Sequence, residues 1–180
     1  MIETKAELFE YLNYEKQLYL VTKKHGFRLF IVNHQDYLLW LLLKNLRKQE
    51  YHINNGHNLR GLFYERRKNY YSHKCGVFIN PNTVGKGLKI WHYGDIIIHD
   101  NAVIGENCQL HGMNCIGNKG IDGSGTPVIG NNVNIGVGAI IIGDVRLANN
   151  ITVAANAVVT KSCFIKGAVL VGTPAREIKN

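Results

Sequence analysis

The chain lacks a long hydrophobic segment and a recognisable leader. Its longest uninterrupted apolar run, residues 37–43, has seven residues, whereas a helix that crosses a bilayer needs roughly 20. The first five residues, Met-Ile-Glu-Thr-Lys, lead into an amphipathic segment and do not resemble a secretory signal. These two absences predict a cytoplasmic protein.

Paired cysteines are missing as well. The four cysteines, Cys75, Cys108, Cys115 and Cys163, form no Cys-x-x-Cys pair. We therefore expect free thiols in a reducing compartment, with Cys108 and Cys115 packed as small side chains.

Dense runs of basic residues are also absent, although the net charge is +8. Residues 1–75 hold 13 Lys and Arg against 7 Asp and Glu, and residues 76–180 hold 8 against 6. No basic run is dense enough to indicate nucleic-acid binding. The excess of positive charge in the first part indicates either a solubilising surface or attraction to an anionic partner, so a peripheral membrane contact stays open.

What the chain does contain is a six-residue repeat in its last third. A period of six matches neither the helical period of about 3.6 nor the strand period of 2, but it matches the hexapeptide repeat of a parallel β-helix. In that fold three hexapeptides close one triangular coil, and each coil buries its aliphatic residues against its neighbours. The aliphatic positions are Ile129, Ile135, Ile141, Leu147, Val153, Val159, Ile165 and Val171.

The same period runs earlier and slips twice. It includes Val84, Ile90, Ile98, Ile104, Leu110 and Ile116. Two residues are added between Ile90 and Ile98, and the spacing from Ile116 to Ile129 is thirteen. The second slip, residues 117–128, is rich in glycine and predicts a loop that leaves the coil. A regular scaffold needs no slips, so both are expected to serve function.

The first 75 residues predict helices over 5–18, 36–48 and 58–71. The predicted fold class is mainly β, a parallel β-helix of hexapeptide repeats over residues 76–180, with an α-helical N-terminal region over residues 1–75.

The first slip carries a specific motif. Residues 88–98 read Leu-Lys-Ile-Trp-His-Tyr-Gly-Asp-Ile-Ile-Ile. The aliphatic Ile90 is followed by His92, by a turn at Tyr93-Gly94 and by the run from Asp95 to Ile98, which matches the pattern aliphatic, x-His-x-x-Gly, aliphatic run. This pattern resembles the serine acetyltransferase family, and most of all its branch that O-acetylates capsules and exopolysaccharides. Segments 110–112, 116–118, 128–130 and 172–176 also match, so the resemblance covers about residues 76–178. It implies a left-handed β-helix.

The resemblance implies an acetyltransferase that uses acetyl-CoA as co-substrate and needs no metal. His92 matches the general base, which removes the proton of a hydroxyl as that hydroxyl attacks the thioester directly. His111, 19 residues further on, is expected to stack on His92 from the next coil and to orient the acceptor. His99 follows the slip, and its direction stays open.

The resemblance also implies the residues that hold coenzyme A. Small residues at Gly136, Gly138, Ala139 and Ala155 match positions where the cofactor lies against the backbone. Thr160, Lys161 and Arg176 match positions where a hydroxyl and two cations meet the nucleotide phosphates.

Two departures from the family weaken free serine as acceptor. The family has an Asp in an Asp-Ile-His-Pro pattern where this chain has Phe78-Ile79-Asn80-Pro81, and a His in Arg-His-Pro where this chain has Gly125-Thr126-Pro127. These departures favour a saccharide hydroxyl, in capsule or exopolysaccharide modification, over serine O-acetylation in cysteine biosynthesis. The further alternative is a scaffold without chemistry.

The resemblance predicts a homotrimer, because one β-helix supplies only half of each groove between subunits. A dimer of trimers through the helical region stays open. The loop over residues 117–128 is expected to cover that groove.

A metalloenzyme is a further alternative, because carbonic anhydrases of the γ class share the fold. Those enzymes need a His-x₄-His pair, whereas His92, His99 and His111 are 7 and 12 residues apart, so the spacing argues against a metal site.

Overall fold

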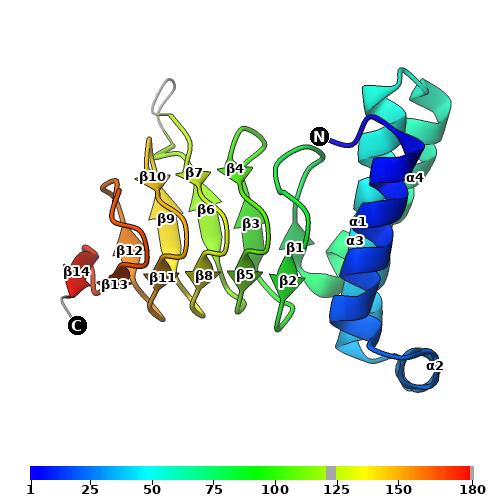
Figure 1. Cartoon of the computed structure of the whole chain (residues 1–180), viewed down its shortest axis with the longest axis horizontal. Helices are drawn as coiled ribbons and strands as arrows, with labels where there is room; N and C mark the ends of the chain where they lie inside the picture. Colours follow the sequence, from blue (N-terminus) through cyan, green and yellow to red (C-terminus); the bar gives the residue numbers. More distant parts are fainter. Residues whose placement is uncertain (121–124, 179–180) are drawn as a thin grey trace. The chain divides into compact units, whose positions relative to one another are not determined.

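A computed structural model describes residues 1–120 and 125–178 of the chain. The chain divides into two compact units, Met1–Val77 and Phe78–Asn180, which Figure 1 shows as a group of helices and a stack of short strands. The predicted division lay after residue 75. No helix in the described part of the chain is long and apolar enough to cross a membrane.

The first unit holds four helices: α1 (Lys5–Leu20), α2 (Lys23–Ile31), α3 (Gln35–Asn54) and α4 (Asn58–Cys75). Three of them extend the predicted segments. The starts of α1 and α2 follow from their caps, because Thr4 and Thr22 accept hydrogen bonds from the backbone N–H groups of Glu7 and His25. Helix α2 was not predicted, since its nine residues are too few to show a clear period.

An ion cluster is buried inside the helical unit. The Arg47 guanidinium lies 2.7 Å from a Glu15 carboxylate oxygen and 3.1 Å from Glu50, and all three side chains are buried. Burial by itself lowers the pKa of Arg47. The two carboxylates together raise this pKa by more than burial lowers it, so it lies above its usual range. Because the guanidinium stays charged, the cluster fixes α1 against α3.

The second unit is a β-helix whose strands are two or three residues long. Their bounds are β1 (Val77–Phe78), β2 (Lys89–Ile90), β3 (Ile96–Ile98), β4 (Val103–Ile104), β5 (Gln109–Leu110), β6 (Cys115–Gly117), β7 (Val128–Ile129), β8 (Asn134–Ile135), β9 (Ile140–Ile142), β10 (Arg146–Leu147), β11 (Thr152–Val153), β12 (Val158–Val159), β13 (Val169–Val171) and β14 (Arg176–Ile178).

These strands form three sheets, one for each face of the coil. The first face has the order β1-β3-β6-β9-β12, the second β4-β7-β10, and the third β2-β5-β8-β11-β13-β14. The pairings from β2 to β13 whose register is given are parallel, whereas β14 runs antiparallel to β13. The chain visits the faces in turn, as a β-helix requires, and Figure 1 shows the resulting ladders from green to red.

The predicted aliphatic ladder forms the core. The positions from Val84 to Val159 are buried, and so are the residues four places on, Val133, Ala139, Val145 and Ala157. The ladder fails only in the final coil. There Ile165 is 54% exposed, and Cys163 bridges Leu147 in its place. Ala168 and Leu170 are buried where the period predicts Val169 and Val171. The register pairs Val153 with Leu170, one residue earlier than the six-residue period predicts.

The two slips interrupt the ladder as predicted. The first lies between β2 and β3, and the second lies between β6 and β7. Residues 121–124, in the middle of the second slip, lie outside the described residues. Of the cysteines expected to pack in the repeat, Cys108 is buried and Cys115 is half-buried, and burial raises the pKa of Cys108 to about 11.

Replacement of Ile135 by Ala should destabilise the protein by about 2–5 kcal/mol, because its side chain is fully buried in the ladder. The matched control is Ile165→Ala, which has the same chemistry and the same place in the sequence repeat but an exposed side chain. It should change the free energy of unfolding by no more than about 0.5 kcal/mol. Chemical denaturation of both variants measures the difference, and equal losses would contradict the assigned register of the last coil.

Candidate active site

The first slip forms an enlarged corner between the third and first faces. The register sets residues 91–95 opposite residues 111–113 of the next coil, because Ile90 pairs with Leu110 and Ile97 pairs with Cys115. The extra length turns through Gly94 and Asp95, which both have positive φ. The added residues therefore project at this corner and do not enter the strands.

His92 lies exposed in this corner. No hydrogen bond to its ring comes from residues 1–120 or 125–178 of the described chain. Its backbone rests on Gly112, where an added Cβ would lie 3.3 Å from the His92 carbonyl oxygen and 3.6 Å from the His92 Cβ. Both ring nitrogens are thus open to a substrate, and glycine at position 112 makes room for the base.

His111 is half-buried one coil further, but it does not stack on His92 as predicted. The register places it opposite Trp91, and the two rings stack with centroids 5.8 Å apart. Its Nε2 lies 2.7 Å from the Asn134 side-chain oxygen. The prediction was wrong because neighbouring coils here are offset by 20 residues, so position 112, and not 111, falls beneath His92.

The same face carries residues that sequence reasoning missed. The Trp91 indole N–H donates to the Gln109 side-chain oxygen at 2.9 Å, and the Lys89 ammonium lies 5.3 Å from the indole ring centre. Together with His111 they hold Trp91 beside the base. Only the pairing of coils reveals this cluster, since its members lie about one coil apart in the chain.

Asn114 supports the corner from inside the coil. It is fully buried, it donates to the Gly136 carbonyl at 2.7 Å, and its oxygen accepts the Gly112 backbone N–H at 3.0 Å. An unsatisfied amide at this depth would be costly, so these bonds fix the position of Gly112 and hence of His92. The sequence showed only a polar residue at an inward position.

A column of backbone hydrogen bonds continues from this corner along the coils. Met113 donates to the Gly94 carbonyl at 3.1 Å, Gly138 donates to Gly112 at 3.0 Å, and Asn156 donates to Val137 at 2.9 Å. The predicted small residues Gly136, Gly138 and Ala155 lie on this column. An added Cβ at Gly136 would lie 2.6 Å from the Ala155 N atom, so tight coil stacking by itself already requires glycine there.

Ala139 differs from the other predicted cofactor residues. Its side chain is fully buried in the coil interior. It therefore cannot line a surface groove, and its small size serves the packing of the core.

The predicted cations meet at the end of the β-helix. Lys161 and Arg176 line one pocket of about 480 Å³, together with Cys163, Phe164 and Ala175. Thr160 is half-buried beside Lys161 in the chain and does not line this pocket. The Glu177 side chain lines the same cavity, and the two exposed cations are the groups there that could pair with a phosphate.

The second slip lies at another corner of the coil, between the first and second faces. There the Thr126 hydroxyl donates to the Asn101 carbonyl at 2.8 Å, and the His99 Nδ1 accepts the Asn101 backbone N–H at 3.1 Å. His99 therefore serves a turn. Within the described residues of one chain, neither Thr126 nor His99 joins His92, and no three His, Cys, Asp or Glu side chains form a metal-binding group.

Substitution of Gly112 by Ala should lower the activity that depends on His92 by roughly tenfold or more, because the new methyl group pushes on the His92 backbone. Gly167→Ala is the control, since Gly167 also has positive φ but nothing lies within 4 Å of an added Cβ. Both variants should lose about 1–3 kcal/mol of stability from backbone strain. Equal activity in the two variants would show that Gly112 does not position the base.

No family model matches the chain. The sequence is similar to that of a serine acetyltransferase of Helicobacter pylori. The two are 32% identical over 105 residues, which cover 57% of this chain and 61% of that protein. The chain spans about half the length of the first curated relatives it matches, all named serine acetyltransferase.

The fold is also similar to solved serine acetyltransferases. Soybean serine acetyltransferase complexed with serine has 27% identity and a TM-score of 0.69, over 79% of this chain and 58% of that one. A serine acetyltransferase in complex with CoA has 20% identity and a TM-score of 0.71, over 97% of this chain and 71% of that one, which shows a common fold. The predicted left-handed β-helix with N-terminal helices is thereby confirmed. The comparisons support the resemblance to serine acetyltransferases and not to the capsule branch.

Proposed function

We propose that the chain transfers an acetyl group from acetyl-CoA to a hydroxyl group, with His92 as general base. The observation that carries this proposal is the open imidazole of His92, set on an enlarged corner and supported from below by Gly112 and Asn114. A scaffold without chemistry needs neither the extra residues nor the buried amide beneath them. The similarity to serine acetyltransferases supports the same reaction class.

The chemistry is a direct acyl transfer. An imidazole nitrogen of His92 takes the proton of the acceptor hydroxyl as its oxygen attacks the thioester carbonyl. The new C–O bond forms, the C–S bond breaks, and the imidazolium returns the proton to the departing thiolate to give free CoA. No side chain forms a covalent intermediate, so a single base and correct placement of both substrates suffice.

The proposed path of coenzyme A follows the column from the His92 corner to Ala175, whose N–H donates to the Val158 carbonyl and which lines the pocket of Lys161 and Arg176. The strands of the third face from β2 to β13 span four spacings, or about 19 Å at roughly 4.8 Å for each strand. A thioester at His92 and nucleotide phosphates at Lys161 and Arg176 therefore suit the long, flexible pantetheine arm between them. The glycines and Ala155 on the column leave the backbone accessible to that arm.

Serine is the acceptor that the relatives favour, since each is named for acetylating it. A saccharide hydroxyl is the second candidate, and a specific observation favours it. At the position of the family carboxylate this chain has Phe78, whose side chain is exposed, and at the position of the family imidazole it has Thr126, which is bound to a turn. Phe78 cannot pair with a serine ammonium group, and Thr126 cannot replace an imidazole as a base or ligand.

The proposed assembly is a homotrimer. One chain presents the corner of His92 and the cation pocket on a convex coil, so a second chain is needed to enclose a substrate. Residues 118–120 and 125–127 lie at a different corner from His92, so the proposed role of the loop over residues 117–128 is a contribution to the site of a neighbouring subunit.

Replacement of His92 by Ala should lower kcat by about 10²–10⁴-fold and leave CoA binding nearly unchanged, because the base acts only in the transition state. Thiol release from acetyl-CoA measures turnover, and calorimetry measures CoA binding. His73→Ala is the control, since that side chain is exposed on α4 in the helical unit. Turnover within about threefold of the parent would remove His92 from the mechanism.

The acceptor can be identified by comparing kcat/KM for serine with kcat/KM for a panel of sugars and oligosaccharides. If serine is the substrate, we expect a value at or above about 10⁴ M⁻¹s⁻¹. A sugar that exceeds serine would establish the second candidate. The Phe78→Asp variant makes the test sharper. If the missing carboxylate is the reason that the chain uses another acceptor, the new Asp should raise kcat/KM for serine; if serine is already the substrate, it should not. No thiol release with any acceptor would favour the scaffold.

A further inference from the structure

The surface around helix α2 combines exposed apolar side chains with positive charge. Residues 16–35 contain four Lys and Arg and no Asp or Glu. The nearest carboxylate before this segment, Glu15, is buried against Arg47. This part of the helical unit is therefore the source of much of the excess positive charge.

Helix α2 has two distinct sides. Leu29 is buried, and at Gly26 an added Cβ would lie 3.3 Å from the Leu20 Cβ, so this side packs on the unit. Beside it and on the opposite side lie Phe30, Phe27 and Ile31, which are 53%, 67% and 63% exposed; the Phe30 ring also packs on Tyr37 of α3, with ring centroids 5.4 Å apart. Three large apolar side chains at helical spacing form a continuous exposed stripe.

Basic side chains flank that stripe. Lys24 and Arg28 are exposed and lie one helical turn apart, next to Phe27 and Ile31 in helical order. Long basic side chains beside aromatic ones are typical of helices that lie in the interfacial region of a bilayer, where the stems are buried and the charges meet lipid headgroups. We call Lys24, Phe27, Arg28, Phe30 and Ile31 the α2 surface.

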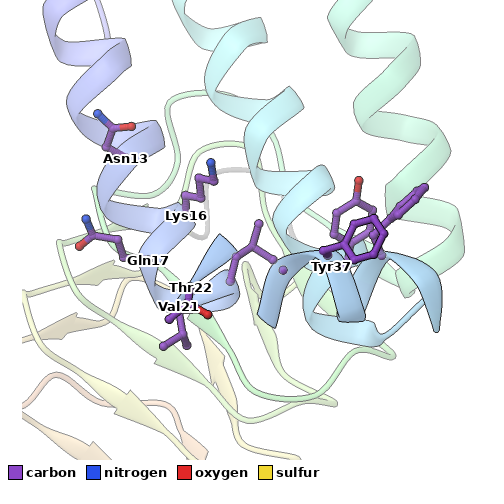
Figure 2. Close-up of a pocket in the computed structure, with 10 residues that line it drawn as sticks. Asn13, Lys16, Gln17, Val21, Thr22 and Tyr37 are labelled. Atoms are coloured by element: carbon purple, nitrogen blue, oxygen red, sulfur yellow. The ribbon is translucent and has the colours of Figure 1, made fainter. Parts of the chain in front are cut away.

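A pocket opens next to the α2 surface, with a volume of about 540 Å³. Phe27 and Phe30 line it from α2, Lys16 lines it from α1, and Tyr37 from α3. Figure 2 shows Lys16 and Gln17 on α1 and Tyr37 on the other side. The polar side chains of Asn13, Gln17 and Thr22 also line it. Aromatic side chains together with a cation suit a lipid with an anionic headgroup.

We propose that the α2 surface docks the protein on an anionic lipid bilayer. Charge complementarity selects this occupant: a neutral apolar partner would not need the cations, and a second copy of the same surface would bring Lys24 and Arg28 against like charges. One short helix gives weak, reversible binding that depends on both apolar contact and charge. The proposal is independent of the acetyl-transfer reaction.

Co-sedimentation of the full chain with lipid vesicles tests the proposal. Binding is expected to vesicles of phosphatidylcholine mixed with phosphatidylglycerol, to be weak on phosphatidylcholine alone, and to fall as salt is added. Phe27→Ser with Phe30→Ser, and separately Lys24→Glu with Arg28→Glu, should each weaken binding by more than about tenfold. All four side chains are exposed, so circular dichroism should show an unchanged fold.

Matched controls carry the same changes elsewhere on the helical unit. Leu59→Ser removes an apolar side chain that is 85% exposed on α4, and Lys5→Glu reverses an exposed charge on α1. Both should leave vesicle binding unchanged. Equal binding to the two kinds of vesicle, or an equal loss in the controls, would overturn the proposal. A different result would also overturn it: the unchanged protein does not bind vesicles, and the double variant Phe27→Ser with Phe30→Ser forms a smaller oligomer. In that case a second copy of the chain would cover the α2 surface.

Discussion

The stacking of one coil on the next is the constraint on which the β-helical unit depends. In residues 1–120 and 125–178 the strands are at most three residues long, so none is stable alone, and each is held by hydrogen bonds to neighbouring coils. The buried ladder from Val84 to Val159 keeps those coils in register. A side chain is therefore placed by its position in its own coil and by what lies at the same position in the next.

The candidate site uses this constraint at one corner. Lengthening a single turn at residues 91–95 costs the ladder nothing, because Ile90 and Ile98 still pair with Leu110 and Ile116. The coil below supplies the support through Gly112 and the buried amide of Asn114. A base presented in this way is exposed yet fixed, which general-base catalysis requires.

The two units place different demands on their surfaces. The β-helix has polar corners, with asparagines such as Asn131 and Asn149 bonded from coil to coil. The helical unit fixes α1 to α3 through the buried Arg47 cluster and leaves the stripe on α2 uncovered. The proposed catalysis and the proposed attachment to a membrane thus rest on residues of separate units.

The sequence by itself determined the type of fold, because an aliphatic residue at every sixth position can be buried in one way only, as Ile135 and Ile141 are. It also located both slips and singled out His92, since a motif in a slip is a local signal. The sequence did not determine the register between coils. Whether His111 or Gly112 lies beneath His92 depends on which turn holds the added residues, and the spacing along the chain does not decide this. For the same reason only the tertiary structure revealed the Trp91 cluster, the burial of Ala139 and the exposure of Ile165. Each of these depends on contacts between residues that are distant in the chain.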